Sequence, residues 1–477
     1  MSNMSSELIA TLFVAISLRS IISMNSYSGF NKPPMFGDYE AQRHWQEITV
    51  NLEVKQWYTN STHNDLQYWG LDYPPLTAYH SYLLGRAAER LNPRYVELNK
   101  SRGFESKDHK SYMRFTVLVA DALVFIPAIL ALSVSMDRIY KKNLKLQLQL
   151  LFAIYPGQAL IDNGHFQYNN ISLGLAVLAV AGLLCDMIYV AAFAFTLALN
   201  YKQMELYHAL PFFAYLLSTS LSQKSAKSAV KELSIIATIV LSTFAILWYP
   251  WSSSIDATSD VLLRLFPVKR GVFEDKVANF WCSINVVYKL KKHFSDHKMA
   301  LICFGTTLLT ALPINVHLFF RRSKYIFILS LFNTAASFFL FSFQVHEKTI
   351  LLLTLPSICL FYWWPKEMLW FLKLSVFSMI PLFKRDNLLV PTVGLMIIFN
   401  LTFKSRYFKS NENEICHRKL KISITQISEI LMIAIFLAFI SIEPPSRFPD
   451  IWPLIICIIS CAHISMFLIW GYTKQFT

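Results

Sequence analysis

Residues 8–18 read LIATLFVAISL, an apolar stretch that Arg19 follows directly. No basic region precedes this stretch and no small-residue cleavage site is evident, so it differs from a secretory signal peptide. We expect residues 8–24 to form an uncleaved first membrane span. Arg19 is then expected to be a snorkelling anchor whose long side chain reaches toward the membrane surface.

Similar apolar runs recur along the whole chain, which is 54% hydrophobic and only 16% charged over 477 residues. Runs close to the length that crosses a bilayer, separated by short polar breaks, are typical of a polytopic membrane protein. We therefore expect an all-α membrane protein with about 14 transmembrane helices, built as one domain over residues 1–477. After 8–24, the expected spans are residues 112–135, 147–162, 169–185, 188–201, 207–222, 233–250, 298–319, 325–342, 349–364, 368–383, 388–404, 423–442 and 450–470.

The formal charge of +14 comes from Lys and Arg scattered between the spans, without the basic arm of a nucleic-acid-binding protein. With a cytosolic N-terminus, the even-numbered breaks carry clusters such as Lys141-Lys142 and Arg321-Arg322, as the positive-inside rule requires. Both termini are then cytosolic, and the long loops 25–111 and 251–297 lie on the opposite face. The 251–297 loop is basic against this rule, which a phosphate-binding site would explain.

The first long loop, residues 25–111, has helical periodicity in two places. Its apolar residues 41, 45, 48 and 52 share one helical face, as do residues 76, 79, 83, 87 and 91. We expect two amphipathic helices at the membrane surface, the second starting at Pro74-Pro75. Asp38 and Asp72 then lie near loop-to-helix junctions, where capping is the ordinary role of an acidic residue.

Seven motifs carry a resemblance to one family, and they follow one another in that family's order. They are GDYEAQRHW at 37–45, YWGLDYPPLTAYH at 68–80, SRGFES at 101–106, DNGHFQYN at 162–169, NYKQMELYHA at 200–209, LFPVKRGVFEDKVANFWC at 265–282 and FSFQVHEKTIL at 341–351. The chain resembles the dolichyl-phosphate-glucose-dependent glucosyltransferases of the endoplasmic reticulum, members of the GT-C superfamily. The run EDKVANFW at 274–281 makes it similar to the branch that adds the first glucose, in α-1,3 linkage, to the nine-mannose glycan.

This resemblance implies an inverting transfer from a β-linked lipid-phosphate donor, dolichyl-phosphate-glucose, to a dolichyl-diphosphate-linked oligosaccharide. A phosphate leaving group needs no general acid, whereas the acceptor hydroxyl needs a base on the opposite face of the sugar. The family's base carries over to Asp38, and Asp72 is the second choice. For Glu40 two roles stay open, orientation of the acceptor or a bond to the loop.

Cations around the leaving phosphate are expected from other loops on the same face, above all Arg270, His346 and Lys348. A cap with an internal Glu347–Lys348 charge balance is the alternative for the last two. Lys202 and Glu205 are expected to bind substrate or to pair with each other, and Glu274 has the same two options with Lys276. His165 and Gln167 either contact sugar or hold the backbone. Tyr73 and Asp275 complete the expected substrate-binding residues.

No metal site or other cofactor is expected, because the His residues are too dispersed for a ligand set and the seven Cys lie mostly in apolar segments. The pair Asp38 and Glu40 keeps a divalent ion as a minor alternative. Two other functions stay open: the sibling enzyme that adds the second glucose, and a polytopic lipid or solute transporter. The gathering of polar motifs at one face favours an enzyme over a transporter.

Overall fold

The computed structural model describes residues 2–266, 276–408 and 423–477. Within these ranges the chain consists of helices joined by turns and loops. Within these ranges the only β contact is an isolated bridge between Ser61 and Asn64, so no strand forms. The expected all-α class is therefore confirmed. The helices of the first half are α1 (Ser2–Ser23), α2 (Asp38–Asn51), α3 (Pro75–Leu91), α4 (Lys107–Ala120), α5 (Ile126–Tyr140), α6 (Lys145–Ile154), α7 (Pro156–Ala159), α8 (Asn169–Leu184), α9 (Ile188–Tyr201), α10 (Leu206–Leu221) and α11 (Ala226–Trp248).

The second half continues the same pattern of long helices joined by short turns. Its helices are α12 (Ile255–Leu265), α13 (Phe280–Ile284), α14 (Leu290–His293), α15 (Asp296–Phe320), α16 (Lys324–Phe341), α17 (Leu351–Leu360), α18 (Pro365–Ser378), α19 (Ile380–Arg385), α20 (Leu389–Phe408), α21 (Ile424–Ser441) and α22 (Ile451–Phe476). Short 3-10 segments lie between them, at η1 (Val54–Gln56), η2 (Pro93–Tyr95), η5 (Gln203–Glu205), η6 (Tyr249–Trp251) and η8 (Glu347–Ile350). Two π-helical segments, η3 (Asp121–Phe125) and η4 (Leu160–Phe166), interrupt the early helices.

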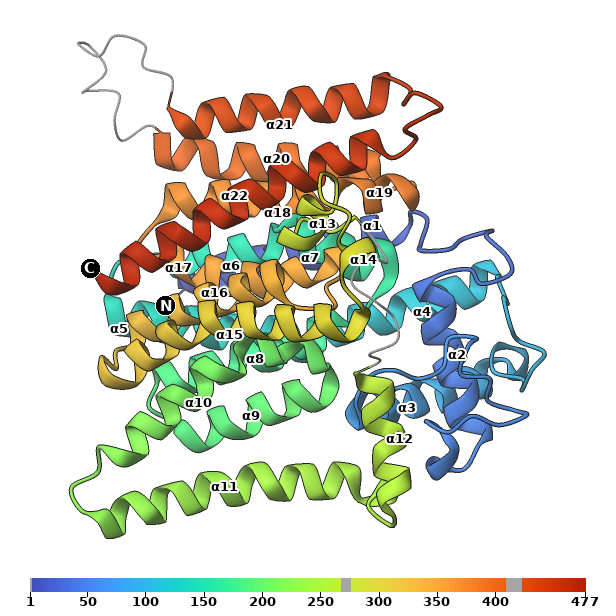
Figure 1. Cartoon of the computed structure of the whole chain (residues 1–477), viewed down its shortest axis with the longest axis horizontal. Coiled ribbons are helices and arrows are strands. Elements are labelled where there is room, and N and C mark those ends of the chain that lie inside the picture. Colours follow the sequence, from blue (N-terminus) through green and yellow to red (C-terminus); the bar gives the residue numbers. More distant parts are fainter. Residues whose placement is uncertain (1, 267–275, 409–422) are drawn as a thin grey trace.

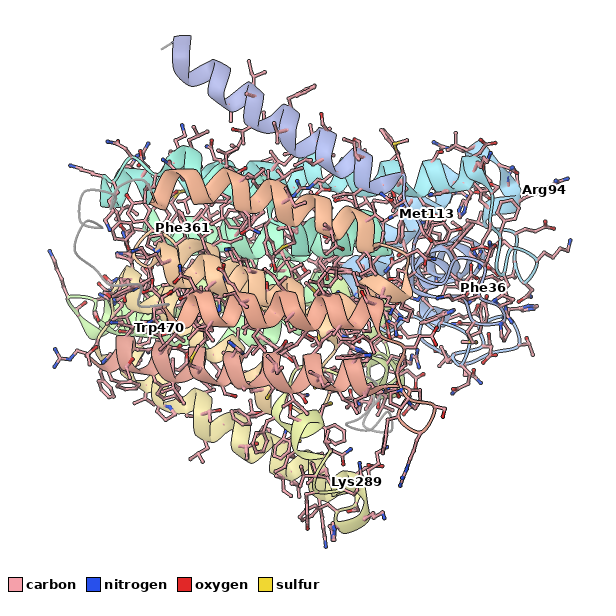
Figure 2. All side chains as sticks on the ribbon, turned by 90° about the horizontal axis from the view of Figure 1, so that it is seen from above. Phe36, Arg94, Met113, Lys289, Phe361 and Trp470 are labelled. Carbon is pink, nitrogen blue, oxygen red and sulfur yellow. The ribbon has the colours of Figure 1, made fainter. Side chains whose placement is uncertain are left out.

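Most of the long helices run side by side along the long axis of the molecule, whereas α2 and α12 cross that direction at one end (Figure 1). Seen from above, Phe36 and Arg94 of the first long loop lie at that end, and Phe361 and Trp470 lie at the other (Figure 2). The helical bundle therefore has two chemically different ends, one of them carrying a substantial extra layer.

Six helices are long and apolar enough to cross a membrane, and four shorter apolar helices accompany them. The six are Lys107–Tyr140, Ala226–Trp251, Asp296–Phe320, Lys324–Phe341, Ile424–Ser441 and Ile451–Phe476. Each of the fourteen expected spans falls on helical segments of the structure. This confirms a polytopic membrane fold, while the number of crossings stays a prediction.

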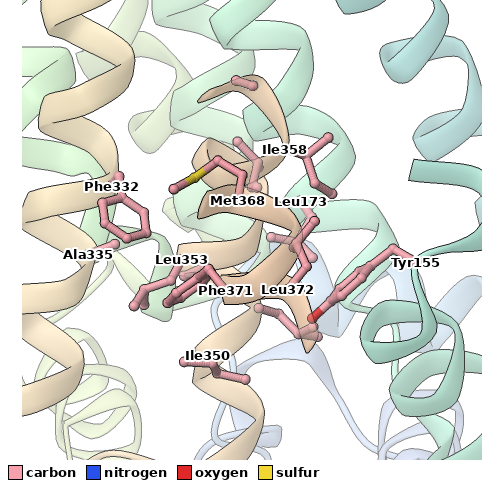
Figure 3. Close-up of a cluster of buried hydrophobic side chains, with 14 of the residues drawn as sticks. Tyr155, Leu173, Phe332, Ala335, Ile350, Leu353, Ile358, Met368, Phe371 and Leu372 are labelled. Carbon is pink, nitrogen blue, oxygen red and sulfur yellow. The ribbon is translucent and has the colours of Figure 1, made fainter. Parts of the chain in front are cut away.

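The core of the bundle is apolar and closely packed. Figure 3 shows Phe332 of α16, Leu353 of α17 and Phe371 of α18 meeting with Tyr155 and Leu173 from the first half of the chain. The rings of Phe332 and Phe371 pack edge to face with centroids 5.2 Å apart. Because this packing joins both halves, the loops at the end of the bundle are held in fixed relative positions.

Arg19 does not snorkel, and the expectation that it would is wrong. Its side chain is only 1% exposed and pairs with Asp121 of η3, with Nε 3.3 Å from Oδ1. The same guanidinium donates to the Ala153 carbonyl at 2.7 Å and to Gln158 Oε1 at 2.8 Å. A buried charge is tolerated only with such partners, and the sequence of α1 alone does not reveal partners on other helices.

The two expected loop helices exist, and α3 begins at Pro75 as its sequence predicts. Helix α2 differs from an ordinary amphipathic surface helix, because every residue from Tyr39 to Thr49 is buried. Its apolar side packs on the loop, where Trp45 Nε1 donates to the Trp69 carbonyl at 2.9 Å. Its polar side is covered too, since Arg43 Nη1 donates to Ser101 Oγ at 2.6 Å. A rigid layer therefore carries the first motif to the end of the bundle.

Candidate active site

Asp38 is the first residue of α2, and the N-cap position of this helix belongs to the residue before it. The N-cap is Gly37, which makes no side-chain cap, and the Asp38 N–H donates to Ser28 Oγ at 3.2 Å. A Cβ on Gly37 would clash with Ser28, so glycine is required for this approach. With its backbone N–H satisfied by Ser28, Asp38 keeps its side chain available for other contacts.

Three donors converge on Oδ2 of that carboxylate. His165 Nε2 lies 2.9 Å away, and both the side-chain amide of Gln167 and the ammonium of Lys348 contact the same oxygen. His165 is 1% exposed and Asp38 is 20% exposed, so the carboxylate lies between the protein interior and the solvent. The structure thus brings together four expected site residues from three separate motifs.

The π-helical segment η4 aims His165 and Gln167 at one atom. A π-turn widens the helix locally, and such turns are frequent at functional sites. Phe166, between the two residues, has a φ of 90°, an uncommon value for a residue with a side chain. Its ring is fully buried and packs 4.9 Å from the ring of Tyr39, which holds this strained backbone in place. Both polar side chains therefore reach Asp38.

Lys348 enters the site from η8, directly after α16. His346 is the N-cap of this short helix, where its N–H donates to Thr349 Oγ1 at 3.1 Å, and its side chain is exposed. Lys348 Nζ also lies 3.2 Å from His165 Nε2. The VHEK motif therefore supplies a cation to the carboxylate, and His346 lies exposed two residues before that cation.

The charges around Asp38 keep it ionised. Burial alone would raise the pKa of Asp38, but the charges of Lys348 and His165 hold that pKa well below its ordinary value. Burial and Lys348 lower the pKa of His165, yet its two neighbouring carboxylates, Asp38 and Asp386, raise it above the usual value overall. An ionised carboxylate that is partly exposed can accept a proton from a bound hydroxyl.

A second cation, Lys202, stands beside this group. Its ammonium donates to Asn169 Oδ1 at 2.5 Å and lies 4.7 Å from the ring centroid of Tyr73. Burial, and then repulsion by Lys348, lower the pKa of Lys202 to about 8. The loop at Asp72 is tied to the same place, because Gln203 Nε2 donates to the Asp72 carbonyl at 3.0 Å.

Of the two options for Lys202 and Glu205, pairing with each other is wrong, and substrate binding stays a prediction. Glu205 is fully buried and its Oε2 lies 2.8 Å from Nδ1 of His208, on the first turn of α10. His208 Nε2 in turn contacts the Leu352 carbonyl at 2.9 Å. Lys202 is the N-cap of the short η5 segment and Glu205 is its last residue, and the two side chains have different partners. Through His208, Glu205 links the start of α10 to α17.

Glu40 also turns away from Asp38, and of its two expected roles the bond to the loop is confirmed. Its oxygens accept two bonds from Arg43, both at 2.7 Å, and one from the Tyr68 hydroxyl at 2.8 Å. Arg43 Nη2 also pairs with Glu47 Oε2 at 2.8 Å. Burial raises the pKa of Glu47, but the hydrogen bond with His44 and the charge of Arg43 outweigh burial and lower this pKa to about 2. This network stiffens α2.

Neither aspartate is the N-cap residue of its helix. The N-cap of α3 is Pro74 and that of α2 is Gly37, and neither residue makes a side-chain cap. Three other expected site residues, Arg270, Glu274 and Asp275, lie outside the described residues. In the parts of the chain that are described, no group of three or more His, Cys, Asp or Glu is arranged to hold a metal ion.

Asp386 is the one site residue that no sequence motif indicated. It follows α19 and is 2% exposed, and its Oδ2 lies 2.5 Å from His165 Nδ1. Asn169 was likewise missed, although it ends the DNGHFQYN motif. The sequence held a weak indication of Asp386, an acidic residue at a break between two apolar runs, 221 positions from its partner.

The whole sequence matches a known family and its members. The family model described as "ALG6, ALG8 glycosyltransferase family" matches residues 13–470. A Drosophila melanogaster protein named probable dolichyl pyrophosphate Man9GlcNAc2 alpha-1,3-glucosyltransferase is 59% identical over 99% of this chain and 99% of its own length. Proteins with that activity in their names from Pongo abelii and Arabidopsis thaliana are 44% and 39% identical, over 96% and 98% of this chain and 94% and 90% of their own lengths. This chain therefore belongs to the ALG6, ALG8 glycosyltransferase family.

Proposed function

We propose that this protein transfers glucose from dolichyl-phosphate-glucose to dolichyl-pyrophosphate-linked Man9GlcNAc2, forming an α-1,3 linkage during assembly of the N-glycan precursor. The acceptor and the linkage are those in the names of its relatives. The observation that carries the proposal is the Asp38 carboxylate, held ionised by Lys348 and His165 at the exposed edge of a buried polar cluster. Its position suits a general base for a sugar hydroxyl.

The reaction is a single displacement at the anomeric carbon of glucose. The acceptor hydroxyl oxygen attacks that carbon while the bond from the carbon to the lipid phosphate breaks, and the bonding electrons leave with the phosphate. The hydroxyl proton passes to Asp38. Attack from the face opposite the phosphate inverts a β-linked donor into an α-linked product, and one carboxylate is sufficient for this chemistry.

The leaving phosphate gains negative charge as its bond to glucose breaks, and nearby cations stabilise that charge. Lys348 and Lys202 both lie close enough to Asp38 to feel its charge. His346, two residues before Lys348 and exposed at the start of η8, is placed to join them. We include Arg270 in this set on the strength of its motif. The long apolar helices supply a surface for the isoprenoid chain and the surrounding membrane lipid.

The site belongs, in this proposal, on the lumenal side of the endoplasmic reticulum membrane, with both termini cytosolic. Asp38, His165, Lys202 and Lys348 all come from breaks that the alternating span order assigns to one face. Lys142, from a break assigned to the other face, donates its N–H to the Tyr362 hydroxyl at 2.7 Å, beside Phe361 at the opposite end. This separation supports the expected orientation of alternate breaks.

The experiment is transfer of radiolabelled glucose from dolichyl-phosphate-glucose by the purified protein alone. We expect label on lipid-linked Man9GlcNAc2, in a linkage that an α-1,3-specific glucosidase cleaves, and an unchanged rate with chelator. Label only on an acceptor that already carries one glucose would indicate the sibling enzyme. Movement of intact lipid across a vesicle without any transfer would indicate a transporter. A chelator-sensitive rate restored by manganese would overturn the metal-independent reaction.

A further inference from the structure

We infer that Asp386 is a positioning residue for the proposed transfer and acts on the base Asp38 through the imidazole of His165. This inference rests on the proposed function, and it adds a residue that lies outside all the motifs. His165 lies between two carboxylates: its Nε2 is 2.9 Å from Asp38 Oδ2, and its Nδ1 is 2.5 Å from Asp386 Oδ2. His165 and Asp386 are 1% and 2% exposed, so water does not compete for these contacts.

The backbone around Asp386 fixes its carboxylate. Its N–H donates to the Leu382 carbonyl at 3.2 Å, which closes the end of α19. Asn387 then adopts a left-handed φ of 59°, and the Leu388 N–H returns to the Phe383 carbonyl at 2.8 Å. This is the pattern of a left-handed helix C-cap, which stops a helix at a defined residue. Asp386 is therefore held at one orientation toward His165.

The other side of His165 is fixed as firmly. Its carbonyl accepts from the Ser28 N–H at 3.0 Å, and the preceding Gly164 carbonyl accepts from Arg114 Nη2 at 2.7 Å. With its backbone held, the ring has one remaining freedom, rotation about its side-chain torsions. The contact from Nδ1 to Asp386 removes that freedom and directs Nε2 toward Asp38, as the orienting partner of a functional histidine does.

Asp386 also controls the charge on the ring. The charged groups that face His165 are Asp38 of α2, Lys348 of η8 and Asp386 after α19, with Arg114 of α4 bound to the neighbouring carbonyl. Burial and Lys348 disfavour the imidazolium, and the two carboxylates restore it, so the pKa of His165 stays above its usual value. Loss of one carboxylate removes part of that support and shifts the pKa of His165 downward.

The test is the pH dependence of transfer in Asp386→Asn, compared with the wild type. The asparagine keeps the shape but not the charge, so His165 loses its proton at a lower pH than in the wild type. We expect kcat to fall about 10- to 100-fold near neutral pH, with little change in either KM. On the alkaline side, the rate of the variant should decline at a lower pH than the rate of the wild type. At acidic pH the imidazolium of His165 is restored, so the difference in kcat between variant and wild type should become smaller.

Two further variants separate positioning from a general loss of structure. In a His165→Gln background, Asp386→Asn should cause no further loss, because Asp386 acts only through the ring. Asp386→Glu keeps the charge and should show a lower kcat with the wild-type alkaline limb, which tests the idea even if the asparagine variant folds poorly. Asp186→Asn, at an exposed pair with Lys324, is the matched control and should behave as the wild type.

An equal loss at every pH, or an additive loss in the double variant, would overturn the inference and leave Asp386 a structural residue. A wild-type rate and pH profile in Asp386→Asn would do the same. In each of these three cases the wild-type protein still transfers glucose, so the proposed function stands. A wild-type protein that transfers no glucose would instead overturn the proposed function and the inference together.

Discussion

The Asp38 carboxylate makes all its contacts with described residues through one oxygen. His165, Gln167 and Lys348 each contact Oδ2, and the side chain remains partly exposed. This division suits a base, because one oxygen is held in place while the other can face the acceptor hydroxyl. The same arrangement lowers the pKa of Asp38, so the carboxylate is ionised before any substrate binds.

Asp38→Asn is expected to lower kcat by about 10²- to 10⁴-fold, the usual contribution of a general base. An amide keeps the size of the side chain but cannot take the proton, so donor binding should change little. The measurements are single-turnover transfer and binding of labelled donor. Asp72→Asn is the comparison, since Asp72 is the second carboxylate that the motifs of the same loop indicate. A dead Asp72→Asn with an active Asp38→Asn would move the base to Asp72.

Lys202 gives a prediction about pH that depends on its position beside Lys348. Because the pKa of Lys202 is lowered to about 8, its ammonium is charged below that pH and neutral above it. If this charge attracts the donor phosphate, the donor KM should rise as the pH increases from 7 to 9. The measurement is donor KM against pH with saturating acceptor.

The matched variants are Lys202→Arg and Lys202→Ala. An arginine stays charged throughout this range, so its donor KM should not rise between pH 7 and 9. The alanine variant should have a raised KM at pH 7 and resemble the wild type at pH 9. A wild-type KM that is constant across the range contradicts a role for the Lys202 charge in donor binding.

At the scale of elements, the contact of α16 with α22 rests on one glycine and two buried amides. Asn333 Nδ2 donates to Gln475 Oε1 at 2.8 Å, and Gln475 Nε2 donates to the Ile314 carbonyl at 2.8 Å. A Cβ on Gly471 would overlap the Asn333 side chain. Small residues allow membrane helices to approach closely, and here the gap admits a polar contact across three helices.

Gly471→Ala is expected to destabilise the protein by about 1–3 kcal/mol, because the added methyl forces Asn333 out of its hydrogen bond. Thermal unfolding in detergent would show a lower Tm. Gly305→Ala on α15 is the matched control, since a Cβ there meets nothing within 4 Å. Its higher helix propensity should leave Tm equal or raise it. Equal Tm values for both variants would contradict the close contact of α16 with α22.

At the scale of the molecule, sequence patterns predicted the helices and singled out Asp38, but they did not predict which residues would contact each other across the bundle. Hydropathy located the spans because a bilayer requires apolar runs of a set length, and the GDYE motif located Asp38. Periodicity says nothing about which helices meet, so Arg19 was expected at the surface and Asp386 was missed. Spacing offered a pair between Lys202 and Glu205 as one option, whereas in the structure Lys202 contacts Asn169 and Glu205 contacts His208. Tertiary contacts between distant breaks are therefore what sequence reasoning lacked.

The orientation of the whole molecule can be tested by glycosylation. Asn60, in the sequon Asn60-Ser61-Thr62, is exposed on the loop that carries the site, so we expect a glycan there in cells. Asn400 also heads a sequon, but its side-chain amide donates to the Met396 carbonyl within α20. A gel shift lost on endoglycosidase treatment and in Asn60→Gln is the readout. Modification at Asn400 instead would reverse the orientation.

The buried contact of Arg19 with Asp121 also constrains the order in which the chain enters the bilayer. When α1 leaves the ribosome, Asp121 and Gln158 have not yet been translated, so the arginine has none of its later partners. On insertion scales a lone arginine costs about 2.5–3.5 kcal/mol at the centre of a helix, and this is an upper bound for Arg19, which lies toward the C-terminal end of α1. We expect α1 to remain at the translocon or the lipid interface until α4 to α7 arrive, and to complete its insertion only with them.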